Sequence, residues 1–217
     1  MELPFTQDEF FAVFAAYNRS VWPAQIGLVV LGLVILAAAY RGRDRFASLV
    51  AAGLSGLWMW MAIVYHWTFF RVINPVATVF GALFLLQSVL FIVDFVFQRE
   101  RAPASLSART SGIAMVGYAL LIYPALGWLL GQRYPEFPTF GLPCPTTIAT
   151  FGVLAFRRTR SPWWLLIIPT AWGLVGTAAA FSLGVYEDLV LLAAVLSFWA
   201  LRWHERARPI WRQVVVS

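Results

Sequence analysis

Seven long apolar segments fill most of the 217-residue chain, and this pattern limits its fold more than any other feature. Hydrophobic residues make up 61% of the sequence and charged residues only 12%, so one soluble core could not bury all the apolar side chains. Most segments reach the roughly 20 residues that a helix needs to cross a membrane. We therefore expect an all-α membrane protein, a seven-transmembrane helix bundle in one integral membrane domain over residues 1–217. The expected spans are residues 21–40, 46–66, 75–97, 110–131, 139–156, 162–183 and 186–203.

The basic residues predict how the chain is threaded through the membrane. All sixteen are arginines, and thirteen of them flank the apolar segments on one side of the expected bundle. Only Arg19, Arg71 and Arg133 fall on the other side. Because basic loops stay in the cytoplasm, we expect the N-terminus outside and the C-terminus inside. Arginines in short runs between apolar segments, and not on one face of a domain, also argue against a nucleic-acid partner.

A short helix is expected before the first span. Thr6 and Glu9 have the spacing of a capping box, and Phe10, Phe14 and Tyr17 recur on one helical face. Residues 6–18 are too few to span a membrane, which favours an interfacial helix on the outer surface. The alternative is that these residues extend the first spanning helix.

The fifth apolar segment contains the most informative irregularity. Pro143-Cys144-Pro145 cannot lie inside a regular helix, because proline lacks an amide proton and restricts the residue before it. A helix that resumes at Pro145 rises only about 18 Å before Arg157. The chain from Tyr134 to Cys144 would then enter the membrane as a re-entrant segment beside a wet cavity. A kinked but complete helix from Thr139 is the alternative.

The polar residues near this break form the predicted pocket. Cys144, at the Pro-Cys-Pro break, is expected to be reachable by water from outside. The alternative is that Glu187 and Asp188 cap a helix N-terminus and that the other polar side chains only hold helices together. Asp94, near the inner end of the third span, is expected to pair with Arg99 or Arg101. The pocket candidates are Asn18, Trp22, Gln25, His66, Pro143, Cys144, Pro145, Thr146, Thr147, Glu187 and Asp188.

Metal and catalytic chemistry have little support in the sequence. Cys144 and His66 are weak candidates for a soft-metal site such as one for Cu(I), which would need further soft ligands. A single cysteine also excludes an intrachain disulfide. No metalloprotease, nucleophile-elbow, P-loop or dinucleotide motif is present. We therefore expect no cofactor and no enzymatic activity.

Two motifs carry a family resemblance. The runs YNRSVWPAQ at residues 17–25 and GLPCPTT at residues 141–147 resemble an uncharacterised bacterial family of small multi-pass membrane proteins. The resemblance implies a bacterial inner membrane and no appended soluble domain. It implies no reaction, since the family is a domain of unknown function.

Three functional hypotheses follow from these features. The first is a transporter or channel for a small solute or ion, with an outward-facing pocket at the Pro-Cys-Pro break. The second is a non-catalytic structural or assembly partner, whose polar groups only hold helices together. The third is a membrane enzyme that acts on a lipid. In each case the lipid bilayer is the surrounding partner.

The arginine distribution generates the first testable prediction. A reporter fused to the C-terminus should be active only when that reporter functions in the cytoplasm, because thirteen arginines favour that side. A reporter fused before Thr6 should instead be active only when it is of a kind that functions in the periplasm. Periplasmic activity of the C-terminal fusion would overturn the predicted threading.

Overall fold

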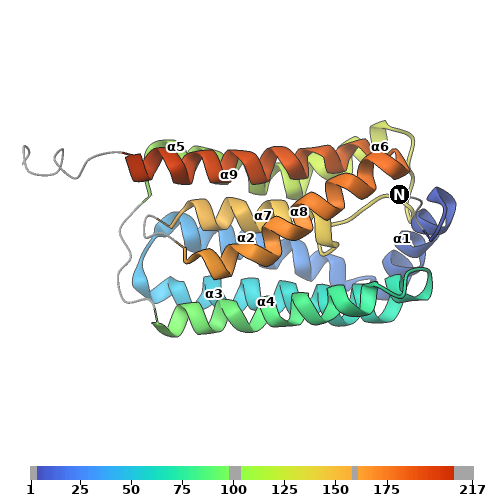
Figure 1. Ribbon diagram of the computed structural model, residues 1–217, viewed down its shortest axis with the longest axis horizontal. Helices are drawn as coiled ribbons and strands as arrows, with labels where there is room; N and C mark the ends of the chain where they lie inside the picture. The colour runs from blue at the N-terminus through green and yellow to red at the C-terminus, as the bar shows by residue number, and fades with distance from the viewer. Residues whose placement is uncertain (1–3, 98–103, 158–160, 208–217) are drawn as a thin grey trace, which may run out of the picture.

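The computed structural model describes residues 4–97, 104–157 and 161–207, and this part of the chain is helical apart from its connecting segments. The helices lie side by side along the long axis of the molecule, with α1 across one end (Figure 1). The α-helices are α1 (Gln7–Val21), α2 (Ala24–Arg41), α3 (Ala47–Trp60), α4 (Ala77–Phe97), α5 (Leu106–Gly117), α6 (Tyr123–Leu129), α7 (Pro143–Ala155), α8 (Trp163–Leu183) and α9 (Leu189–Ala207). Short 3₁₀ segments are η1 (Asp44–Phe46), η3 (Phe70–Val72) and η5 (Tyr186–Asp188), and π-helical segments are η2 (Met61–Phe69) and η4 (Tyr118–Ile122).

Five helical stretches are long and apolar enough to cross a membrane, by length and composition. The π-helical segments continue α3 and α5, so that two of the five stretches are composite. The predicted all-helical architecture is therefore confirmed, whereas the predicted count of seven spans is not. Two further apolar stretches are shorter, α7 over Pro143–Ala155 and the part of α9 over Leu189–His204. The five stretches are 24–41, 47–72, 77–97, 106–129 and 163–183.

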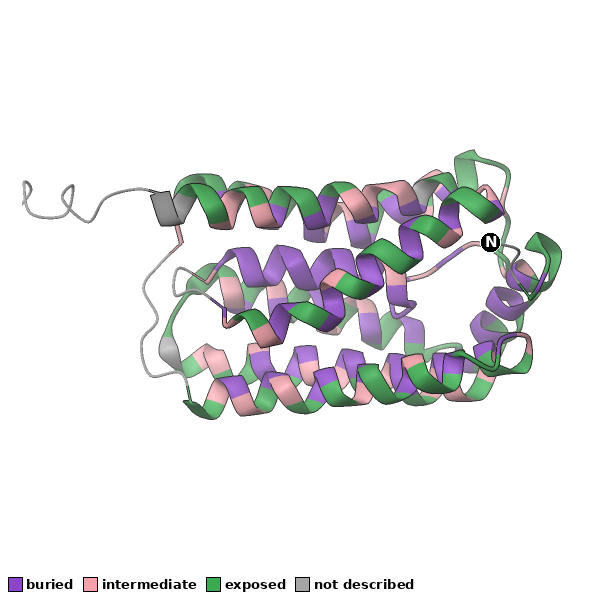
Figure 2. Ribbon diagram, in the orientation of Figure 1, coloured by how far each residue is buried: buried purple, intermediate pink, exposed green. Residues whose placement is uncertain are grey.

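Helix α7 differs from the others because it has no outward face. Every residue from Pro143 to Ala155 is buried except Cys144, which is half-buried. Figure 2 shows α7 as a buried helix between neighbours that expose part of their surfaces. It packs against α5, α9, α8 and α2. The segment predicted as the fifth span, residues 139–156, is thus a central helix that starts at Pro143 and contacts protein on all sides.

Two glycines allow α7 to approach α5 closely. A Cβ atom on Gly112 would lie 2.7 Å from the carbonyl oxygen of Gly152, and a Cβ on Gly152 would lie 2.8 Å from the carbonyl oxygen of Gly112. Both distances are too short for any residue larger than glycine without backbone movement. Small residues at a helix crossing are a common means of close packing in membranes. The α5–α7 contact therefore depends on these two positions.

Helix α1 is separate from the first span and begins as predicted. Thr6 is its N-cap, and the reciprocal Thr6–Glu9 bonds complete the capping box. The hydrogen bonds from Thr6 also lower the pKa of Glu9. The chain turns at Trp22-Pro23 before α2 begins, so α1 does not extend the spanning helix. Of the two arrangements that the sequence left open, the structure has the separate helix, which ends at Val21 and not at Asn18.

The aromatic face of α1 packs against protein. The rings of Phe10 and Phe70 lie 6.0 Å apart, and those of Tyr17 and Phe69 lie 5.7 Å apart. Phe14 lies against Tyr65 in the same cluster. The face that suggested contact with the membrane surface is therefore buried on η2 and η3, because their aromatic side chains offer it a partner within the protein.

The fold gathers the described arginines at opposite ends. The C-terminal ends of α2, α4, α7 and α9 lie at one end of the bundle, and α1 lies at the other (Figure 1). Arg41, Arg43, Arg109 and Arg157 line a common cavity at the first end. Arg19 belongs to α1 at the second end. We refer to the first as the arginine end and to the second as the α1 end.

The glycine contact generates a stability prediction. Gly152→Ala should lower the free energy of unfolding by about 1–3 kcal/mol, because an added methyl group would force α5 and α7 apart. Thermal unfolding in detergent, followed by tryptophan fluorescence, measures the change. Gly56→Ala is the matched control, because a Cβ there would meet nothing within 4 Å. Equal melting temperatures for the two variants would contradict the close α5–α7 contact.

Candidate functional site

The GLPCPTT motif builds the start of α7. Gly141 has a φ of +103°, and a Cβ there would lie 2.5 Å from Leu28 Cδ1, so glycine is required both for conformation and for space. Leu142 is an extended N-cap, as a residue before proline favours, and Pro143 occupies the first turn. The Gly141 amide donates to Thr146 Oγ1 at 3.2 Å, and the Thr146 amide donates to the Leu142 carbonyl. Thr146 therefore stabilises the turn and is not an open pocket group.

The segment before α7 enters the bundle from the α1 end, and Asn18 holds it there. Asn18 Nδ2 donates to the carbonyl oxygens of Pro135 and Phe137, at 2.6 and 2.9 Å. Its Oδ1 accepts from Gln25 Nε2 at 2.6 Å and from Thr139 Oγ1 at 2.8 Å. All the bonding capacity of the Asn18 amide is used in this way. Of the two predicted arrangements, the structure has the irregular entering segment and not a helix from Thr139. The predicted helix start at Pro145 is wrong by two residues, because α7 begins at Pro143 and its first turn accommodates both prolines.

The other predicted pocket residues take separate positions. Trp22 is 59% exposed, whereas Asp188 is buried and accepts a hydrogen bond from the Tyr123 hydroxyl. Asn18 and Gln25 form hydrogen bonds that hold the entering segment, whereas His66 is packed among aromatic rings. The side chain of Glu187 lies outside the described part of the chain. The predicted outward-facing set is thus divided between a loop clamp, an exposed ring and a buried polar pair.

Cys144, Thr147 and His66 come closest to the predicted grouping. Cys144 lies beside Gly176 of α8, and Thr147, three residues on, shares its helical face. His66 is fully buried, and its ring lies 5.2 Å from that of Trp172, also on α8. The His66 nitrogens and Thr147 Oγ1 have no partner among the described residues. Pro143 and Pro145 are buried in the first turn.

The described residues contain no group of three or more His, Cys, Asp or Glu side chains that could hold a metal ion. His66 is surrounded instead by aromatic rings, with that of Phe84 at 4.6 Å. The soft-metal hypothesis for Cys144 and His66 therefore gains no third ligand of these types from the fold.

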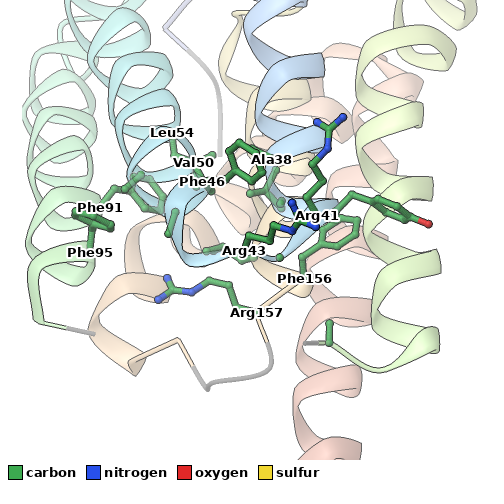
Figure 3. A pocket seen from close by; sticks show the side chains of 18 of the residues that line it. Ala38, Arg41, Arg43, Phe46, Val50, Leu54, Phe91, Phe95, Phe156 and Arg157 are labelled. Atoms are coloured by element: carbon green, nitrogen blue, oxygen red, sulfur yellow. The ribbon is translucent and has the colours of Figure 1, made fainter. Parts of the chain in front are cut away.

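A cavity of about 230 Å³ lies at the opposite, arginine end of the bundle. It is formed by α2, α3, α4 and α7, with Arg109 from α5. Figure 3 shows Arg41, Arg43 and Arg157 around it, with Phe91 and Phe95 of α4 on one wall. Among the described residues, the lining contains arginines, mainly apolar side chains and one acid. The principal lining residues are Tyr40, Arg41, Arg43, Phe46, Val50, Leu54, Phe91, Asp94, Phe95, Arg109, Val153, Phe156 and Arg157.

Aromatic rings and helix ends hold the arginines at this cavity. The Arg109 guanidinium lies 4.5 Å from the centre of the Tyr40 ring and donates to the Tyr40 carbonyl at 2.9 Å. That carbonyl belongs to the last turn of α2, where a cation is favourable. Arg41 lies 5.9 Å from the centre of the Phe46 ring. Gly42, with a φ of +59°, ends α2 and lets the chain turn towards η1.

Asp94 is the acid among the described residues of the cavity lining, and Arg157 is its described partner. Its Oδ2 forms an ion pair with Arg157 NH1 at 2.5 Å. The predicted partners, Arg99 and Arg101, lie outside the described residues. The ion pair joins α4 to the C-terminal end of α7. Because α7 ends at Ala155, Arg157 lies beside α4. Sequence distance gives no indication of such a contact.

Comparison with known families supports one assignment. A model described as a family of unknown function (DUF6064) matches residues 7–210. The chain belongs to this family. The match starts at the first residue of α1 and continues past the end of α9, so the DUF6064 unit is the whole helical bundle. Neither the curated proteins nor the solved structures contain a match.

The arginines of this DUF6064 chain predict its threading from the sequence, but no shared site was predicted for them. The signal for a shared site was present, because Arg41, Arg43, Arg109 and Arg157 all flank apolar segments on the same predicted side. The aromatic walls gave no such signal, since phenylalanines occur throughout the apolar segments. Only the fold brings these residues around one cavity.

The four hydrogen bonds of the Asn18 side chain, which we call the Asn18 clamp, generate a prediction about proteolysis. Asn18→Leu should increase the rate of trypsin cleavage after Arg133 about tenfold or more, because the entering segment loses all its bonds to the amide. Gln25→Leu should give a smaller increase, since it removes only the bonds to Asn18 and Thr139. Fragment appearance on gels measures both rates in detergent.

The matched control is Asn74→Ala, which removes the bond that Asn74 Oδ1 accepts from the Val76 amide. This variant should leave cleavage after Arg133 unchanged. Cleavage of the Asn18→Leu protein at the wild-type rate would show that the entering segment is held by other contacts.

Proposed function

We propose that this DUF6064 protein is a multi-pass membrane protein that binds an anionic amphiphile at the arginine end of its bundle. The bound group is a phosphate ester with an attached apolar chain. The single observation that carries the proposal is the cavity of about 230 Å³ lined by four arginines and by aromatic side chains. No reaction is assigned to this site.

The charge of the cavity supports an anionic ligand. Its lining contains Arg41, Arg43, Arg109 and Arg157 but only one described acid, Asp94. Arg157 is paired with that acid. Three arginines therefore remain without an acid of the lining to neutralise them. Guanidinium groups favour phosphate, and basic pockets between membrane helices bind lipid headgroups.

The size and the walls of the cavity support an amphiphile over a simple anion. Phe46, Phe91, Phe95 and Phe156 line it together with aliphatic side chains. A volume of about 230 Å³ is below the roughly 300–1,000 Å³ of sites that enclose a drug-sized molecule. It suits a headgroup and the first part of an apolar chain. The rest of that chain would lie along the exposed apolar surface, to which Leu49 and Val96 belong.

The outward-facing pocket expected for a solute or ion transporter remains a prediction. Of its predicted residues, Cys144, Thr146 and Thr147 belong to the buried start of α7, and Asn18 and Gln25 hold the entering segment. The arginine cavity differs from it in place, charge and expected orientation. Binding of a small solute can be tested at the arginine cavity, because a soluble phosphate ester would contact the same guanidinium groups.

The proposal predicts selective binding of anionic lipid. Native mass spectrometry of the detergent-solubilised protein should detect phosphatidylglycerol bound more tightly than phosphatidylcholine of the same chains. Arg41→Gln combined with Arg43→Gln should weaken phosphatidylglycerol binding about 10- to 30-fold, because each basic side chain near a headgroup contributes about 1 kcal/mol.

The matched control removes two exposed arginines from the α1 end, by Arg19→Gln combined with Arg71→Gln. It has the same net charge as the cavity variant and should bind as the wild type does. Glycerol phosphate, which lacks the apolar chains, should compete only weakly. Strong competition would assign a soluble phosphate ester as the ligand, and equal effects of the two double variants would overturn the site.

A further inference from the structure

The cavity contains a feature that an anion alone does not require. Asp94 lines it and is only 3% exposed. One carboxylate oxygen, Oδ2, is paired with Arg157 at 2.5 Å. The other, Oδ1, is buried and has no partner among the residues that the structure describes. A strong hydrogen-bond acceptor therefore lies in the same cavity as Arg41, Arg43 and Arg109.

This acceptor distinguishes between anionic ligands. A carboxylate repels a phosphate group and attracts a hydrogen-bond donor. A buried acceptor without a partner costs free energy, which a donor group on the ligand would recover. The ligand that fits both features has a phosphate for the arginines and, a few atoms away, a donor for Asp94 Oδ1.

We propose that Asp94 selects a phosphodiester headgroup that ends in a hydroxyl, as in a glycerol-type phospholipid. The inference rests on the proposed binding of an anionic amphiphile and specifies its headgroup. Asp94 Oδ1 accepts a hydrogen bond from the hydroxyl, while the arginines bind the phosphate. Asp94 is thus a specificity-determining residue of the cavity, held in position by Arg157.

The net charge of the cavity decides between a hydroxyl and an ammonium donor. Four arginines oppose one described acid in the lining, so an additional cation would enter a site that is already positive. An ammonium headgroup would also cancel the negative charge of its own phosphate. A hydroxyl donates to Asp94 without adding charge, and it keeps the lipid anionic.

The test compares two lipids of equal charge, of which only one has a hydrogen-bond donor in its headgroup. Phosphatidylglycerol and phosphatidylmethanol of identical chains carry the same single negative charge, but only the first has headgroup hydroxyls. Native mass spectrometry of the wild-type protein in detergent should show about tenfold tighter binding of phosphatidylglycerol, as expected for one hydrogen bond to a charged acceptor. Phosphatidylethanolamine should bind more weakly than either.

The Asp94→Asn variant assigns the preference to this residue. The preference for phosphatidylglycerol should fall to about twofold or less, because a neutral amide is a weaker acceptor. Phosphatidylmethanol should bind this variant more tightly than the wild type, since a negative charge near the phosphate has been removed. That gain cannot result from a misfolded protein, which would bind both lipids more weakly.

The possible results distinguish failure of the role of Asp94 from failure of the proposed function. Equal binding of phosphatidylglycerol and phosphatidylmethanol to the wild type would overturn the role of Asp94 but keep the anionic site. An unchanged preference in Asp94→Asn would also overturn it. Tighter binding of phosphatidylethanolamine than of phosphatidylglycerol would overturn the hydroxyl assignment. Failure of both anionic lipids to bind more tightly than phosphatidylcholine would instead overturn the proposed function.

Discussion

A helix in the middle of a bundle has no contact with lipid or water, so each polar group on it must find its partner inside the protein. Helix α7 meets this requirement at Thr146 and Thr150, whereas Thr147 Oγ1 has no partner among the described residues. Gly141 donates to Thr146, the Thr146 carbonyl accepts from Thr150, and Trp58 donates to Thr150 at 3.0 Å. The mutual approach of Gly112 and Gly152 fixes the helix against α5. The positions of both ends of the bundle depend on this central packing.

The two ends of α7 have different tasks. At its N-terminal end, the prolines and Gly141 make the helix begin inside the bundle, and Asn18 holds the segment that precedes it. At its finish, the short helix places Arg157 beside Asp94 of α4. The ion pair therefore contributes both to helix packing and to the chemistry of the arginine cavity. Removal of either partner alone would leave a charge without its counterpart in a largely apolar setting.

Local signals in the sequence were sufficient for several features. The capping box of Thr6 and Glu9, the helix start at the Pro-Cys-Pro break and the separation of the arginines to two sides all follow from short-range chemistry. The number of spans did not follow, because an apolar helix has the same composition whether it faces lipid or other helices. Asp94 and Arg157 are 63 positions apart in the sequence, and Asn18 lies more than 115 positions from the carbonyl groups that it binds. Hydrophobic periodicity predicts local structure and cannot predict contacts over such distances.

The enclosure of α7 has a consequence for the order in which the chain assembles during synthesis. Thirteen residues rise only about 20 Å, and irregular chain precedes them, so α7 is a poor substrate for insertion into lipid by itself. It packs against α5 on one side and against α8 and α9 on others, and α9 follows all of these helices in the chain. The cover around α7 is therefore complete only after α9 has been made. A chain that stops before Leu189 would leave the side of α7 that faces α9, which includes Phe151, without its cover.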